Sequence, residues 1–236
     1  MSGILYIISA PSGSGKSTLV NELRTIVRDL DFSISYTTRP PPGSEQSGRE
    51  YFFITRQEFE QMINRGEFLE YAEVFGNYYG TARRFLKEAQ QRGKDLLLDI
   101  DVQGARQVRS KIPDAVSIFV MPPDKPTLES RLWKRSQAEN VKPEVIQRRL
   151  ETATKEIENY RNYGYILLND RLEQAVDELR AIVLSERIKR AGPPFPPGAS
   201  DLFAIAERCR QANAQERIKP VLRSFGQGVS GSGALK

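Results

Sequence analysis

A run of small and hydroxyl-bearing residues ending in lysine and serine stands near the start of the chain, at residues 10–18, APSGSGKST. Gly13 and Gly15 permit a tight backbone path in which successive N–H groups point at one anion, and a following helix adds its positive end. In the related pattern G-x-x-x-x-G-K-[ST], Lys16 reaches the β- and γ-phosphates and the Ser17 hydroxyl can coordinate Mg²⁺. The residue types and spacing therefore predict a nucleotide-binding loop. Its members are Ala10, Pro11, Ser12, Gly13, Ser14, Gly15, Lys16, Ser17 and Thr18.

Ala10 occupies the position where this pattern has its first glycine. Pro11 restricts Ala10 to an extended conformation, as suits a residue that leaves a strand, so the alanine is compatible with a working loop. The apolar run 4–9 precedes the loop and helical spacing of leucines follows it. This strand–loop–helix context favours phosphate binding over the alternative of a chance glycine–serine turn.

The elements around the loop predict an α/β fold, with a parallel sheet flanked by helices. Short apolar runs typical of buried strands occupy residues 4–9, 95–101, 116–121 and 163–169. Helical patterns follow near 82–92, 125–136, 141–162 and 171–190.

Four segments depart from this alternation. Residues 33–81 are rich in proline, glycine and aromatic residues, which predicts an inserted lobe of short strands and a helix. Residues 136–144 are polar, as in a mobile lid, and 191–198, AGPPFPPG, form a stiff linker. Residues 199–236 are expected to be an extension with a short helix and a disordered end, dispensable for the chemistry of residues 1–190.

Composition excludes several classes of function. With one cysteine and no histidine, the chain can build neither a disulfide framework nor a typical zinc site, and a cytoplasmic enzyme is expected. No apolar run is long enough to span a membrane and no signal peptide is recognised. The net charge is +5, but most of the excess lies beyond residue 190, so nucleic acid is not an expected partner.

Several longer motifs resemble the guanylate kinase family, which transfers phosphate from ATP to GMP. They are SAPSGSGKST, SYTTR, FLEYAEVFGNYYGT and LLDIDVQGARQV, in this order, and RLWKR, IQRRLETATKE and LLNDRLEQAV extend the resemblance to residue 190. The resemblance implies that residues 33–81 bind GMP and that residues 136–144 are the lid. The extension lies outside it.

The resemblance assigns guanine to Glu70, with Ser35 and Thr81 as hydroxyl partners. Guanine presents two adjacent donors, N1–H and the 2-amino group, and one carboxylate can accept from both. Adenine has an acceptor at N1 and would leave that carboxylate unpaired, which rejects the wrong base. A solvated charge is the alternative for Glu70, although its apolar neighbours disfavour it.

The resemblance also assigns the phosphate of GMP to Arg39, Tyr51 and Tyr79. The family has a second arginine three residues after the first, where this chain has Pro42. Arg49 is close enough in sequence to substitute for it.

Two carboxylates end the strand at 95–101, where ligands of parallel sheets bind. By resemblance Asp101 contacts the guanine side and Asp99 holds Mg²⁺ through water. Helix capping is the alternative role for either residue.

The donor side receives three arginines by resemblance. Arg131 and Arg135 share a helix face, so both can point at the same anion, and Arg149 comes from the helix after the lid. All three resemble the arginines that stabilise charge on the transferring phosphoryl group. Asn169 resembles the residue near the adenine of ATP. Solvated helix charges are the alternative for the arginines.

These inferences predict Mg²⁺-dependent phosphorylation of GMP, and of dGMP, by ATP in purine nucleotide metabolism. A kinase for another nucleoside monophosphate is one alternative, which Glu70, SYTTR and NYYGT disfavour. A catalytically silent domain that binds a phosphorylated protein is another, which the retained Lys16 and arginines disfavour. The sequence leaves monomer and homo-oligomer open.

Overall fold

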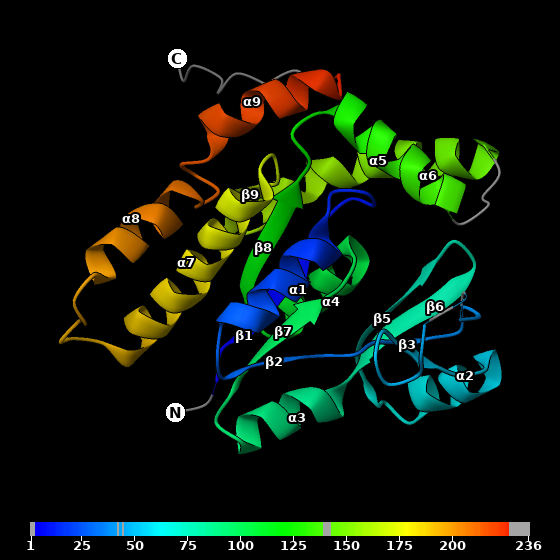
Figure 1. Ribbon diagram of the computed structural model, residues 1–236. Coiled ribbons are helices and arrows are strands. Elements are labelled where there is room, and N and C mark those ends of the chain that lie inside the picture. The colour runs from blue at the N-terminus through cyan, green and yellow to red at the C-terminus, as the bar shows by residue number, and fades with distance from the viewer. Residues whose placement is uncertain (1–2, 42, 44, 139–142, 227–236) are drawn as a thin grey trace, which may run out of the picture. The chain divides into compact units, whose positions relative to one another are not determined.

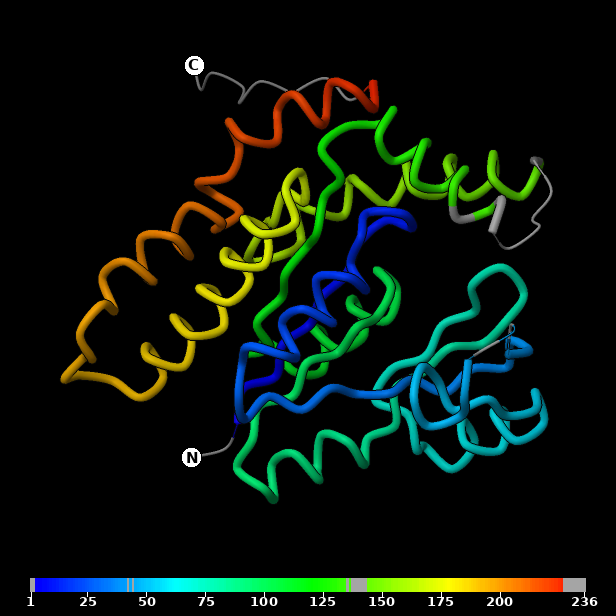
Figure 2. The backbone as a smooth tube through the Cα atoms, viewed as in Figure 1, coloured from blue at the N-terminus to red at the C-terminus, as the bar shows by residue number. Residues whose placement is uncertain are grey.

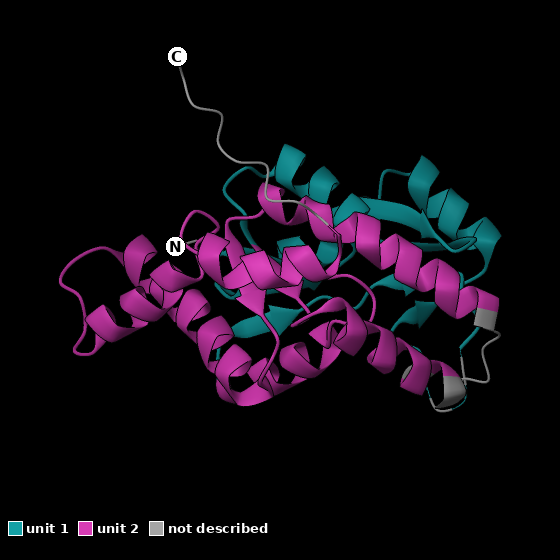
Figure 3. Cartoon of the chain, turned by 90° about the horizontal axis from the view of Figure 1, so that it is seen from above, with its two compact units in different colours: residues 1–9, 27–117 teal, residues 10–26, 118–236 magenta. Residues whose placement is uncertain are grey.

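The computed structural model describes residues 3–41, 43, 45–138 and 143–226. The chain forms two compact units, one of residues 1–9 and 27–117 and one of residues 10–26 and 118–236 (Figure 3). Both contain parallel strands and helices, so the expected α/β class is confirmed.

Three parallel strands form the centre of the first unit. They are β1 (Leu5–Ser9), β2 (Leu30–Phe32) and β7 (Asp95–Asp99), and they pair in the order β2-β7-β1. Leu5 pairs with Leu96, and Tyr6, Ile7 and Leu97 are fully buried. Strands covered on both faces have continuous apolar runs, which is why β1 and β7 were recognisable in the sequence. The three-residue β2 was not predicted.

A second, mixed sheet occupies the segment in which an inserted lobe was expected. Its strands are β3 (Tyr36–Thr37), β4 (Phe52–Phe53), β5 (Phe68–Val74) and β6 (Asn77–Ala82), in the order β4-β3-β6-β5. Helix α2 (Arg56–Asn64) begins with a capping box, in which Thr55 and Glu58 each accept the backbone N–H of the other. Phe59, Met62 and Phe68 form the core of this sheet and helix.

Two more helices belong to the first unit, α3 (Arg83–Gln91) and α4 (Val102–Lys111). The sequence did not predict α4, because its buried face consists of Gly104, Ala105 and Val108 and gives a weak apolar pattern. α4 packs against β1 and β5, so it connects the parallel sheet with the mixed one.

The second unit begins with the glycine loop and α1 (Lys16–Ile26). Its other elements before the extension are β8 (Val116–Met121, within the unit from Ile118), α5 (Lys125–Ala138), α6 (Pro143–Glu156), the 3₁₀ helix η1 (Ile157–Asn162), β9 (Tyr165–Leu168) and α7 (Leu172–Ala191). β8 and β9 are parallel, α1 packs on α7, and α5 packs on α6 (Figure 1).

The described part of the C-terminal extension, up to residue 226, contains two helices, α8 (Ala199–Arg208) and α9 (Gln215–Ser224), where the sequence indicated one. The chain turns back after α7, and α8 packs along that helix (Figure 2). Pro220 lies inside α9 and obscures its helical pattern.

Residues 227–236, and 139–142 of the expected lid, lie outside the described residues. Within the described part of the chain, no helix is long and apolar enough to cross a membrane.

Candidate functional site

The glycine loop adopts the tight backbone path that its sequence indicates. Gly13 and Gly15 have φ of +87° and +86°, in the region that favours glycine. A Cβ on Gly15 would lie 2.4 Å from Asn169 Nδ2. Among the described non-glycine residues only Asp29 and Phe75 have positive φ, so Ala10 carries its methyl group without backbone strain. The alanine is therefore compatible with the loop geometry.

Two side chains from outside the loop converge on one of its carbonyl groups. Asn169 Nδ2 donates to Ser14 O at 2.7 Å, and Arg131 Nη1 donates to the same oxygen at 3.4 Å. Arg131 Nη2 also donates to Asn169 O at 3.4 Å. The sequence did not predict this arrangement, in which Asn169 holds the loop itself. Its contact with adenine stays a prediction.

The other donor-side residues lie on helices of the same unit. Lys16 is the half-buried first residue of α1, and Ser17 is exposed beside it. Arg149 in α6 is half-buried, whereas its neighbour Arg148 is exposed. Arg135 lies in α5, but its side chain is outside the described residues.

Glu70 is a buried carboxylate in the first unit. It lies in β5 opposite Thr81 of β6, and both are buried, with Glu70 only 3% exposed. A Cβ on Gly104 would lie 2.3 Å from Glu70 Oε2, so α4 approaches this carboxylate closely. Gly104 was missed because α4 itself was missed. A solvated Glu70, the alternative considered from the sequence, is wrong.

Burial raises the pKa of Glu70 to about 7, and the negative charge of Asp101 adds to the rise. Thr81 and Lys111 act in the opposite direction. The Thr81 hydroxyl lies near enough to favour the carboxylate form, although its oxygen has no well-aligned hydrogen bond among the described residues. A ligand with two N–H donors would stabilise the ionised form further.

Asp101 caps α4. Its Oδ1 accepts from Gln103 N at 2.7 Å and from Gly104 N at 2.9 Å, so the capping alternative holds for this residue. The same cap fixes Gly104 beside Glu70. Contact of Asp101 with guanine stays a prediction.

Arg39, Tyr51 and Tyr79 form a second group in the first unit. The Arg39 guanidinium carbon lies 5.3 Å from the Tyr51 ring centroid, and the Tyr51 and Tyr79 rings are 5.8 Å apart. Burial raises the pKa of Tyr51 to about 12, with a further contribution from the charge of Asp99. Tyr51 is therefore a neutral hydrogen-bond donor at neutral pH.

Arg39 also has an acidic partner that the sequence did not indicate. Its Nη2 lies 2.6 Å from Glu45 Oε2, and both side chains are about one-quarter exposed. Arg49 pairs with Glu50 and its side chain is 56% exposed. Pro42 lies outside the described residues.

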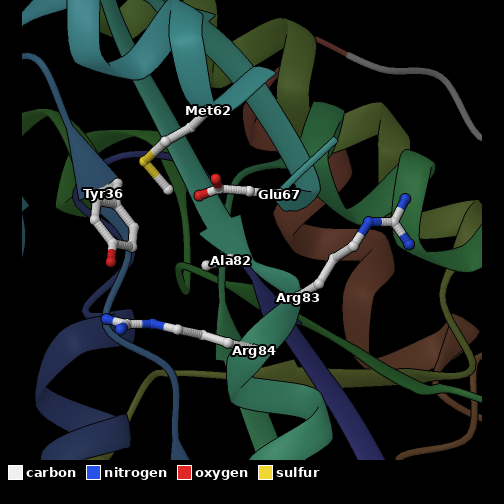
Figure 4. A pocket seen from close by; sticks show the side chains of 6 residues that line it. All are labelled: Tyr36, Met62, Glu67, Ala82, Arg83 and Arg84. Atoms are coloured by element: carbon white, nitrogen blue, oxygen red, sulfur yellow. The ribbon is translucent and has the colours of Figure 1, made fainter. Parts of the chain in front are cut away.

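A pocket of about 280 Å³ lies elsewhere in the first unit. It is lined by Tyr36, Met62, Glu67, Ala82, Arg83 and Arg84 (Figure 4). The Arg84 guanidinium lies 5.7 Å from the Tyr36 ring centroid. None of the predicted site residues lines this pocket, although Tyr36 and Ala82 adjoin Ser35 and Thr81 in sequence.

The family model for guanylate kinase matches residues 2–186. The chain belongs to the guanylate kinase family. It is 58% identical to a guanylate kinase of Koribacter versatilis over 225 residues, covering 95% of this chain and 97% of that one. A guanylate kinase of Nitrosospira multiformis is 50% identical and covers 80% of this chain and 89% of its own.

A solved structure agrees with this family. The crystal structure of guanylate kinase from Anaplasma phagocytophilum matches with a TM-score of 0.67 at 32% identity, over 86% of this chain and 94% of that chain. The family model ends before the extension, as expected. The Koribacter guanylate kinase nevertheless covers more of the chain than the residues before 191 could supply, so its similarity includes part of the extension.

Proposed function

We propose that this chain transfers the γ-phosphoryl group of ATP to GMP, and also to dGMP, giving ADP and the nucleoside diphosphate. The observation that carries the proposal is Glu70, a carboxylate buried opposite Thr81 with its pKa raised to about 7. Burial of such a group is costly unless a ligand uses it. The N1–H and 2-amino groups of guanine are the matching donors, with Ser35, Thr81 and Asp101 completing the contacts to the base.

The acceptor phosphate is proposed to bind Arg39, Tyr51 and Tyr79. The guanidinium supplies charge and the two phenols supply O–H donors, which suits a phosphate monoester. Arg39 lies against the Tyr51 ring, so one phosphate can reach both side chains.

The donor phosphates are proposed to bind the backbone N–H groups of residues 10–18 and Lys16. Arg131, Arg135 and Arg149 would neutralise charge on the transferring group, and Asn169 would contact adenine. Ser17 and Asp99 supply the oxygen ligands that Mg²⁺ prefers, Asp99 through water. Mg²⁺ enters with ATP as part of the substrate and shields the charge of its phosphates.

No general base is required. The nucleophile is a phosphate oxygen of GMP, already largely ionised at neutral pH because its second pKa is about 6. The residues named above align this oxygen with the γ-phosphorus and exclude water. With one buried cysteine, the chain suits the reducing cytoplasm, where we propose that it acts.

ADP release with Mg·ATP tests the proposal when GMP, dGMP, AMP, UMP and dTMP are offered in parallel. We expect turnover with GMP and dGMP only. Turnover with AMP but not GMP would favour a different monophosphate kinase. Binding of GMP without turnover of any acceptor would favour a silent binding domain.

A further inference from the structure

The C-terminal extension pairs with β9, the strand that leads to Asn169. Cys209 O accepts from Ile166 N at 2.7 Å, and Gln211 N donates to Gly164 O at 3.0 Å. Through these hydrogen bonds, residues 209–211 lie antiparallel beside β9. The extension therefore supports the element that delivers Asn169 to the carbonyl of Ser14.

Helix α9 is joined to α7 by an ion pair and packs on α5. Arg217 Nη2 donates to both carboxylate oxygens of Glu178, at 2.8 and 3.0 Å, and the Glu178 side chain is only 4% exposed. Ile218, Val221 and Leu222 of α9 are buried. A helix held at so many points is an integral part of its unit.

The end of α9 in turn accepts a backbone hydrogen bond from the start of α5 (Figure 1). The first backbone N–H groups of a helix have no partner within it. Pro126 has no N–H, and Thr127 N donates to Asp124 Oδ1 at 2.6 Å. The remaining donor, Lys125 N, is accepted by Ser224 Oγ at 3.0 Å. One capping group of α5 thus comes from the extension, 99 residues further along the chain.

Helix α5 forms a wall of the glycine loop. Its Leu128 and Leu132 are fully buried, and a Cβ on Gly13 would lie only 3.0 Å from Leu132 carbons. Arg131, between these leucines, donates to Ser14 O. A shift in the start of α5 would therefore reach the loop through both packing and a hydrogen bond.

We propose that residues 199–226 are a positioning element of the nucleotide-binding loop, with Ser224 as the positioning residue. Asn169 and Arg131 both donate to the Ser14 carbonyl. The extension holds the elements that carry them, because it pairs with β9, which leads to Asn169, and accepts a hydrogen bond from the start of α5, which carries Arg131. The sequence predicted a dispensable extension, and this inference is the opposite. It rests on the proposed function only in taking ATP as the ligand of the loop.

Truncation before α8 is a poor test, because exposing the apolar face of α9's partners could unfold the chain. The test uses the full chain with Ser224→Ala, and compares Ser224→Thr, which keeps the hydroxyl. Arg223→Ala is the matched control, because Arg223 is exposed on the same helix. Binding of Mg·ATP without GMP is measured by calorimetry, with KM for GMP and the melting temperature recorded for each variant.

We expect Ser224→Ala to raise the Kd for Mg·ATP about threefold to tenfold, the usual effect of one lost hydrogen bond. Ser224→Thr and Arg223→Ala should stay within about twofold of wild type, and KM for GMP should change less than the Kd for Mg·ATP. A lowered melting temperature with unchanged Mg·ATP binding would overturn the inference, since a merely structural role would give that result. Equal weakening by Ser224→Ala and Ser224→Thr would also overturn it.

The two proposals can fail separately. A wild-type protein that binds Mg·ATP but releases no ADP with GMP would end the proposed function, and Ser224→Ala would still test the positioning role by binding. A wild-type protein that does not bind Mg·ATP would overturn both.

Discussion

Gly104 leaves the space that the Glu70 carboxylate occupies, because a Cβ on Gly104 would lie 2.3 Å from Glu70 Oε2. The glycine lies in the first turn of α4, which Asp101 caps. Asp101 thus fixes the turn that holds Gly104, and Gly104 leaves room for the buried Glu70 carboxylate. The position of Glu70 depends on Gly104 as much as on its own strand.

Gly104→Ala should move the Glu70 carboxylate and weaken GMP binding while leaving ATP binding unchanged. The carboxylate is the flexible end of its side chain, so the protein should fold, with KM for GMP raised about tenfold by the misplacement. Steady-state kinetics with each substrate varied would measure this. A rise in KM for ATP of equal size would show that the substitution disturbs the whole fold.

Glu70→Gln should stabilise the protein in a pH-dependent way. The pKa of Glu70 is about 7 in the folded protein and ordinarily 4.5. Between these values the folded state binds more protons than the unfolded state, so this contribution to stability is present below pH 4.5 and is lost as the pH rises through 7.

Glutamine does not ionise, so its stability lacks this pH dependence. The difference in free energy of unfolding between the variant and wild type should therefore be about 2–3 kcal/mol larger at pH 8 than at pH 5. Urea unfolding of both proteins at the two pH values gives the comparison. If the variant and wild type differ in free energy of unfolding by the same amount at pH 5 and pH 8, ionisation of Glu70 does not destabilise the folded protein.

Glu45→Gln should lower KM for GMP. Glu45 pairs with Arg39 at 2.6 Å, and the phosphate of GMP must replace or share this partner. Loss of a competing, partly exposed ion pair predicts a change of about twofold to fivefold. Arg49→Ala serves as the comparison, because Arg49 is exposed and paired with Glu50, and it should have little effect. A raised KM in Glu45→Gln would instead mean that Glu45 orients Arg39 for the phosphate.

Lys16→Ala should remove most turnover without unfolding the protein. Its ammonium group acts on charge that develops on the phosphates, and deletion of such a preorganised group costs on the order of 10²-fold or more. Circular dichroism would check the fold and ADP release the rate. A loss below about tenfold with a native spectrum would assign the main electrostatic role to other residues.

The local elements were predictable because their signals are local. The apolar runs at 4–9 and 116–121 gave β1 and β8, and the glycine loop was recognised by its own residues. Glycine at positions 13 and 15 is a direct consequence of positive φ. Such features depend on torsion angles and periodicity, which neighbouring residues determine.

The contacts that the sequence did not predict depend mostly on residues far apart in the chain. Ser14 and Asn169 are 155 residues apart, and no pattern at either position indicates their hydrogen bond. The pair of Arg39 and Glu45 was missed for another reason, since both lie in an irregular loop where spacing does not define facing side chains. The role of Ser224 required the three-dimensional position of Lys125.

The ratio of kcat/KM for GMP to that for IMP, in wild type and in Glu70→Gln, tests the central claim most directly. IMP lacks the 2-amino group and therefore offers only one of the two donors that the carboxylate is proposed to accept. We predict that wild type phosphorylates GMP with a preference of about 10- to 100-fold over IMP, the value of one charge-assisted hydrogen bond, and that Glu70→Gln loses most of this preference. No turnover of GMP by wild type, or an unchanged preference in Glu70→Gln, would contradict the account.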